Sequence, residues 1–199
     1  MNKLLAGVKE SISKEELNEM PLKQFEGDIV LVETATMAKI AYNYLQHFPV
    51  IGFDTETKPS FKKGDNHKVA LLQLATHERA FLIRVQKVGL PHEIIKLLVN
   101  PRILKPGVAI HDDLKALQKI NRFSPAGFVE LQNDAKSLGI KDFSLKKLCA
   151  LTLGFRISKS QQLSNWESEE LTDQQMVYAA TDAWASLLIY EKIQQFLHV

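Results

Sequence analysis

The sequence predicts an α/β protein in which helices cover a mixed β-sheet. The first half of the chain alternates short apolar strands with helical segments, and two of those strands are joined by a hairpin turn. From residue 134 onward the spacing of apolar residues is helical. A strand-rich half with a hairpin, followed by a helical half, is typical of a mixed sheet flanked by helices.

Length and composition are those of an ordinary globular domain. The 199 residues are 45% hydrophobic and 24% charged, enough for a core without disulfides. The single cysteine, Cys149, excludes an internal disulfide and a cysteine-based zinc site. No stretch approaches the ~20 apolar residues of a membrane span, and the N-terminal apolar run is too short for a signal peptide. We therefore expect a cytoplasmic protein.

The first elements follow from capping and periodicity. Residues 1–27 are expected to form an N-terminal extension with a short helix, which the capping box of Ser13 and Glu16 starts and Pro21 ends. Residues 28–199 are expected to form one domain. Its first elements are an apolar strand, a helix with apolar residues three or four apart, and a second apolar strand, at residues 28–33, 36–48 and 50–54.

The later elements are assigned in the same way. Two strands on either side of the turn at residues 76–78 form the hairpin, and helices and strands then alternate. Strands are expected at residues 68–75, 79–85, 103–110 and 128–132, and helices at residues 91–99, 112–120, 145–153 and 173–197. Thr172 and Gln175 form a second capping box at the start of the final helix.

Two carboxylates lie at the end of the apolar strand at residues 50–54. Asp54 and Glu56 are two residues apart, so in extended backbone they share a face. Adjacent carboxylates repel each other unless a cation lies between them, and oxygen ligands suit Mg²⁺ or Mn²⁺. The alternative is a strand end with two solvated acids. Phosphatases of the haloacid dehalogenase type also carry two acids after a strand, but the second is aspartate, which Glu56 does not match.

Two further acidic clusters lie on predicted helices. Asp112 and Asp113 begin one helix, where one could cap the helix while the other faces a site, and His111 is expected to form local hydrogen bonds. Tyr178 and Asp182 are four apart on the final helix and therefore share a face. A buried aspartate is costly without a partner such as a metal ion. A surface aspartate beside a core tyrosine is the alternative.

Taken together, these residues resemble the three motifs of the DEDDy 3′→5′ exonucleases. The motifs correspond to residues 53–56, residues 107–114, and Tyr178 with Asp182. Werner-syndrome-type exonuclease domains are the most similar members, and ribonuclease D and the proofreading domain of bacterial DNA polymerase I are more distant. The similarity extends over residues 28–197. It implies a ribonuclease-H-like 3′-5′ exonuclease fold and hydrolysis of terminal phosphodiester bonds, with release of nucleoside 5′-monophosphates.

The resemblance also implies a role for each motif residue. Asp54, Glu56, Asp113 and Asp182 would hold two divalent ions, Mg²⁺ or Mn²⁺, in a two-metal mechanism. The family spacing selects Asp113 rather than its neighbour Asp112. Tyr178, four residues before the last aspartate, fits the tyrosine subtype of the family and would orient the attacking water.

Substrate contacts are expected from basic and aromatic residues near the motifs. The candidates for phosphate contacts are Lys62, Lys63, Arg156 and Lys159, and Trp166 is a candidate for stacking on a base. Each has an ordinary alternative, either solvated surface charge or core packing. Lys146 and Lys147 are expected to lie on a solvated helix face.

The substrate is expected to be nucleic acid with a 3′ end. The chain has no room for the additional helical domains of ribonuclease D, which favours the Werner-type interpretation and DNA over RNA. Any helicase or repair partner would act in trans. Two other functions stay open: a nucleic-acid-binding adaptor that does not cleave, and a metal-dependent phosphatase. The sequence leaves open the preferred strand form, the choice between Mg²⁺ and Mn²⁺, and the oligomeric state.

Overall fold

The computed structural model describes residues 8–58 and 68–197, and its larger sheet contains four strands. These are β1 (Asp28–Val32), β2 (Gly52–Thr57), β3 (Val69–Ala75) and β4 (Arg79–Arg84). Their order is β1-β4-β3-β2, with β1 parallel to β4 and β3 antiparallel to both of its neighbours. A smaller parallel pair joins β5 (Lys105–Gly107) to β6 (Phe128–Glu130). The predicted mixed sheet is therefore confirmed.

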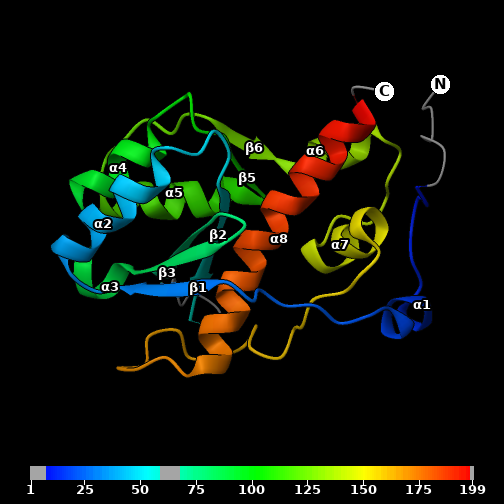
Figure 1. Cartoon of the computed structure of the whole chain (residues 1–199), viewed down its shortest axis with the longest axis horizontal. Helices are drawn as coiled ribbons and strands as arrows, with labels where there is room; N and C mark the ends of the chain where they lie inside the picture. Colours follow the sequence, from blue (N-terminus) through cyan, green and yellow to red (C-terminus); the bar gives the residue numbers. More distant parts are fainter. Residues whose placement is uncertain (1–7, 59–67, 198–199) are drawn as a thin grey trace.

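Helices cover both faces of the four-stranded sheet (Figure 1). The helices α2 (Ala35–Leu45), α4 (His92–Leu98) and α5 (Ile110–Ile120) pack on one face, and α8 (Asp173–Leu197) packs on the other. Strand β4 shows how the sequence fills both layers. Its alternating residues Phe81 and Ile83 enter the first core, whereas Ala80 and Leu82 face α8.

Helix α8 approaches strand β2 very closely. A Cβ atom on Gly52 would lie 1.8 Å from the carbonyl oxygen of Ala183, so this position requires glycine. Ala179 and Ala180 are also buried in the layer between α8 and the sheet. The small residues on this helix face thus bring its polar side chains to the strand that carries Asp54. Neither α8 nor any other helix within the described residues combines the length and apolar character of a membrane span.

Four other helices lie within the described residues: α1 (Lys14–Glu19), α3 (Val85–Val88), α6 (Leu131–Ser137) and α7 (Leu145–Leu153). The predicted capping box of α1 forms, and α7 and α8 have the predicted bounds. Helices α3 and α6 were not predicted. The strand expected at residues 103–110 is only three residues long, because Ala109 adopts a left-handed φ of 58° and α5 begins at Ile110.

The described part of the N-terminal extension packs on the helical half of the chain. The amide of Arg156 donates to Pro21 (3.0 Å), and the amide of Lys23 donates back to Arg156 (2.9 Å). Further along, the amide of Phe25 donates to the Thr181 hydroxyl of α8 at 3.0 Å, and the Phe25 side chain is buried. The extension is therefore anchored beside the residue that precedes Asp182.

Lys105 is a fully buried lysine with no carboxylate partner among the described residues. Its ammonium group donates to the carbonyl oxygens of Asn100, at 2.9 Å, and of Ile103, and it lies 5.2 Å from the centre of the Phe128 ring. Burial lowers the pKa of Lys105 to about 8. The folded protein therefore binds this proton less tightly than the unfolded chain does.

This difference predicts a pH-dependent contribution to stability. Between pH 8 and pH 10.5 the unfolded chain holds the Lys105 proton and the folded protein releases it, so the unfolding free energy rises with pH by roughly 3 kcal/mol. The Lys105→Met variant removes this titration. Urea unfolding of both proteins from pH 7 to pH 10 should give curves whose separation changes with pH; a constant separation would contradict the assignment.

Candidate active site

Three carboxylates from two elements meet beside the sheet. Asp54 and Glu56 project from the same face of β2, and Asp182 comes from α8, which packs against that strand. One carboxylate oxygen from each residue can be chosen so that all three lie within 4.8 Å of one another. The sequence predicted a strand that ends at Asp54, but β2 extends to Thr57 and contains both acids. Regular strand geometry therefore fixes their common direction.

The electrostatics of this group favour a bound cation. Burial, and then the charges of Asp182 and Asp113, raise the pKa of Asp54 well above its ordinary value. Burial and then the charge of Asp54 raise the pKa of Glu56 to about 10. Burial also raises the pKa of Asp182 to about 7, although the Tyr178 side chain and the charge of Lys159 oppose this. The ionised forms therefore need a compensating positive charge.

The donor set fits a hard divalent ion. All three groups offer oxygen, which Mg²⁺ and Mn²⁺ prefer. The Oδ1 atom of Asp182 is buried and has no hydrogen-bond partner among the described residues. A buried polar atom without a partner is costly, and coordination to an ion would satisfy it.

The two aspartates of the second motif have different surroundings. Asp113 is partly buried and accepts a hydrogen bond of 2.5 Å from the hydroxyl of Thr55, the residue between Asp54 and Glu56. Its charge raises the pKa of Asp54, so it acts on the cluster without belonging to the close group of three. The Asp112 side chain is 91% exposed and pairs with Lys115 at 3.4 Å. The structure thus brings Asp113, and not Asp112, beside the cluster.

Neither aspartate caps α5, contrary to the expectation that one of them could. The carboxylate of Glu130 instead accepts hydrogen bonds from the amides of Ala109 (3.0 Å) and Ile110 (2.9 Å). It also caps α6 by accepting from the amide of Gln132 at 3.1 Å. Glu130 lies in β6, about twenty residues from α5 in sequence, so local pattern could not identify it. By capping α5 it frees Asp113 to face the site.

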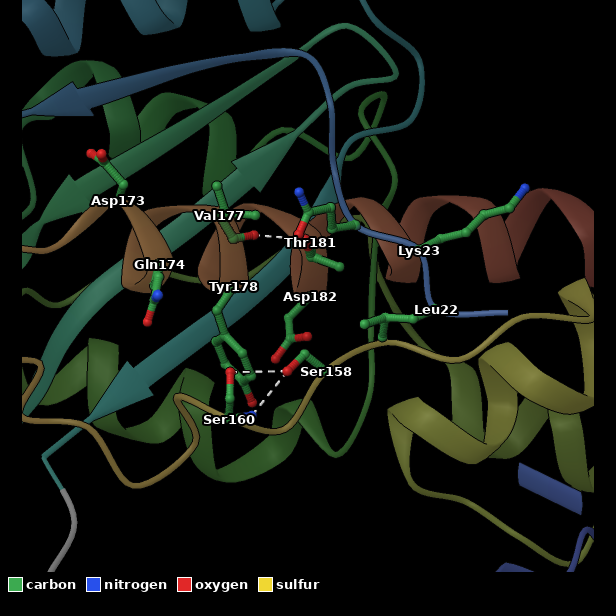
Figure 2. Close-up of a pocket in the computed structure, with 11 residues that line it drawn as sticks. Leu22, Lys23, Ser158, Ser160, Asp173, Gln174, Val177, Tyr178, Thr181 and Asp182 are labelled. Atoms are coloured by element: carbon green, nitrogen blue, oxygen red, sulfur yellow. Dashed lines mark hydrogen bonds between the residues drawn. The ribbon is translucent and has the colours of Figure 1, made fainter. Parts of the chain in front are cut away.

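Tyr178 lies one turn before Asp182 on α8, and Figure 2 shows the two side chains projecting toward Ser158 and Ser160. Burial, and then the charges of Asp182 and Glu56, raise the pKa of Tyr178 above its ordinary value. The hydroxyl is therefore neutral at physiological pH. It can donate or accept a hydrogen bond, but it is a poor base.

Trp166 does not occupy the predicted position at the substrate. It is fully buried beneath Tyr178, with the two ring centroids 5.9 Å apart. A side chain with no exposed face cannot stack on a nucleic-acid base, so the stacking prediction for Trp166 is wrong. Its position supports the Tyr178 ring instead.

The four basic residues that were expected to contact phosphates differ in their positions. Lys62 and Lys63 lie outside the described residues. Arg156 uses its Nε to donate to the carbonyl oxygen of Met20 at 3.1 Å, which holds the N-terminal segment. Lys159 is exposed and lines the cleft that contains the carboxylates.

This cleft has a volume of about 230 Å³ and reveals a residue that the sequence analysis missed. Lys146, from the first turn of α7, lines it together with Lys159 and Gln162. The neighbouring Lys147 forms an ion pair with Asp142 instead. Two adjacent lysines on a helix look alike in sequence, and only the placement of α7 shows which one faces the carboxylates.

A second cavity, of about 280 Å³, adjoins the cleft and shares Ser158, Tyr178 and Asp182 with it (Figure 2). Leu22 and Lys23 of the N-terminal segment form part of its lining. Tyr178 and Asp182 therefore border both spaces, although both residues are buried.

The chain matches a known protein family over most of its length. Residues 29–198 match the 3′-5′ exonuclease family. The chain is 33% identical over 184 residues to the bifunctional 3′-5′ exonuclease/ATP-dependent helicase WRN of Mus musculus. The aligned region covers 87% of this chain and 13% of that protein. It is also 32% identical over 158 residues to the human exonuclease 3′-5′ domain-containing protein 2. That alignment covers 73% of this chain and 25% of the human protein. The chain therefore spans a minor part of these curated relatives.

Solved structures share the fold. The Nibbler EXO domain of Aedes aegypti superposes with a TM-score of 0.79 at 26% identity, covering 88% of this chain and 93% of that one. Escherichia coli RNase D, an exoribonuclease involved in structured RNA processing, gives a TM-score of 0.78 at 23% identity, covering 86% and 45%. The similarity to RNase D concerns the fold alone.

Proposed function

Because the chain belongs to the 3′-5′ exonuclease family, we propose that it removes nucleotides from the 3′ end of a nucleic acid by metal-dependent hydrolysis. The observation that carries this proposal is the group of three carboxylates with oxygens within 4.8 Å of one another, in which the Oδ1 of Asp182 has no hydrogen-bond partner among the residues that the structure describes. Tyr178 lies one helical turn away on the same face of α8. Oxygen ligands beside a neutral hydroxyl suit hydrolysis of a phosphodiester bond.

Each residue has a distinct task in this proposal. Asp54, Glu56 and Asp182 hold the divalent ions, and Asp113 supports them through its position beside Thr55. Two bound ions, Mg²⁺ or Mn²⁺, would stabilise the charge that develops on the attacking and leaving oxygens. The neutral hydroxyl of Tyr178 orients the attacking water by a hydrogen bond, and the buried Trp166 ring keeps Tyr178 in place.

The Tyr178→Phe variant tests the orienting role. Loss of one hydrogen bond to the attacking water should slow single-turnover cleavage by about 10- to 100-fold. Affinity for Mn²⁺, measured by calorimetry, should stay unchanged, because no metal ligand is removed. An unchanged cleavage rate would remove Tyr178 from the mechanism, and a weakened affinity for Mn²⁺ would make it a part of the metal site.

DNA is the favoured substrate in this proposal, on the basis of the resemblance to Werner-type domains. Contacts to the 2′-hydroxyl decide whether a protein accepts RNA, and the similar proteins include one DNA enzyme and one RNA enzyme. They include a DNA polymerase I of Aquifex aeolicus (29% identical over 163 residues) and the exoribonuclease RNase D of Escherichia coli. The preference must therefore be measured directly.

The experiment compares single-stranded DNA, 3′-recessed DNA and RNA, with Mg²⁺, with Mn²⁺ and with chelator. Chromatography of the products should show nucleoside 5′-monophosphates only when metal is present. Binding of the polynucleotides without any cleavage would instead favour the adaptor function. Release of inorganic phosphate from small esters, with intact polynucleotides, would favour the phosphatase.

A further inference from the structure

Two lysines lie on the wall of the cleft that contains the carboxylates. Lys146 comes from the first turn of α7 and Lys159 from the segment that follows this helix. Lys159 is exposed, and it lines the same cleft as Asp54, Glu56 and Asp182. Gln162 lines the same cleft and adds an uncharged hydrogen-bonding group.

The position of Lys146 is unfavourable for a cation in the free protein. The first turn of a helix carries the positive end of its dipole, which favours anions rather than cations. Burial, and then the charges of Arg156 and Lys159, lower the pKa of Lys146. No ion pair to Lys146 is found in the part of the chain that the structure describes.

The neighbouring Lys147 shows the contrast. It lies on the same helix turn, but its ammonium group pairs with Asp142 at 2.7 Å. Lys147 therefore has its counter-charge within the protein. Lys146 forms no ion pair with any of the described residues, and it faces a cleft. An anion that enters the cleft would relieve its repulsion from Arg156 and Lys159.

A polynucleotide carries such an anion at every internucleotide linkage. Divalent ions held by the carboxylates would neutralise the phosphate that is cleaved, but the adjacent phosphates would meet the negative charge of the carboxylates. We propose that Lys146 and Lys159 form a subsite for the internucleotide phosphate next to the scissile one, with Gln162 at its edge. This inference rests on the proposed exonuclease function. It gives Lys146 a positioning role rather than a catalytic one.

The Lys146→Ala and Lys147→Ala variants form a matched pair that tests this subsite. With a single-stranded oligonucleotide, Lys146→Ala should raise KM by about tenfold, the effect of one lost phosphate contact worth ~1.4 kcal/mol. It should also make the dependence of log K on log salt shallower by about 0.7, because one fewer counterion is released. Lys147→Ala should change neither quantity, and Lys146→Arg should restore both.

Binding measured in an Asp54→Asn background separates this inference from the proposed function. Equal salt slopes for Lys146→Ala and Lys147→Ala, in proteins with unchanged circular dichroism, would overturn the subsite. If the wild-type protein failed to cleave but the two slopes still differed, the subsite would stand and the exonuclease function would fall. If Lys146→Ala did not fold, the same comparison would be made with Lys159→Ala.

Discussion

The Asp54→Asn variant should lose at least about 10³-fold in turnover, since the metal contribution that it disrupts is worth several kcal/mol. Asp54 is one of the three acids that could hold a metal ion, and burial and then the charges of Asp182 and Asp113 raise its pKa well above the ordinary value. Asparagine has nearly the same shape but no charge to attract a divalent ion. Single-turnover cleavage of a labelled strand at saturating Mg²⁺ measures the effect.

Asp112→Asn is the matched control for this substitution. It removes the same charge from a residue of the second motif, but the Asp112 side chain is 91% exposed and, within the described residues, pairs only with Lys115. Its turnover should stay within about twofold of the wild-type value, as expected for a surface substitution. Similar losses of turnover in both variants would mean that negative charge near the site is what matters, and not the geometry of the three carboxylates.

The same Asp54→Asn substitution should stabilise the metal-free protein by about 1–3 kcal/mol, because it removes one of several buried like charges. The charge of Asp54 is therefore needed for metal binding but lowers the stability of the metal-free protein. Saturating Mn²⁺ should reverse the order: the wild-type protein gains stability by binding the ion, and the variant gains much less. Thermal unfolding of both proteins, in chelator and in Mn²⁺, gives the four unfolding temperatures that this comparison needs.

The pH dependence of the metal-free protein follows from the same groups. The folded-state pKa of Asp182 is raised to about 7 and that of Glu56 to about 10, so the folded protein binds more protons than the unfolded chain does. The stability contribution of these groups is complete below pH ~4 and is lost as the pH rises through 7 and then 10. In chelator, the wild-type unfolding free energy should fall from pH 5 to pH 9, and more steeply than in Asp54→Asn. If the unfolding free energies of the two proteins changed in parallel with pH, the repulsion assigned to these carboxylates would be contradicted.

Much of the site could be predicted from periodicity. Residues two apart on a strand and four apart on a helix share a face, and this rule places Asp54 with Glu56 and Tyr178 with Asp182. The two capping boxes likewise fixed where α1 and α8 begin. The fold class followed from the order of strands and helices, and the family followed from the resemblance of the three motifs to the DEDDy exonucleases. The match over residues 29–198 confirms the family.

The remaining features depend on contacts between distant segments. Sequence pattern gave no sign that Glu130 would cap α5 or that Lys146 would face the cleft, because each depends on how separate elements pack. Trp166 was assigned to the substrate, but packing against Tyr178 buries it completely. Polar and aromatic side chains near a motif can support the site from behind or face the substrate, and only the tertiary structure separates these cases.

The most direct test of the central claim is the position of the label that is released first. One single strand is labelled at its 5′ end in one sample and at its 3′ end in another, and both are digested in Mg²⁺ by the wild-type protein and by Asp54→Asn. We expect a descending ladder from the 5′-labelled strand and immediate release of a labelled mononucleotide from the 3′-labelled strand, with neither product from the variant. A mononucleotide released first from the 5′ label, or equal digestion by Asp54→Asn, would contradict 3′→5′ hydrolysis at these carboxylates.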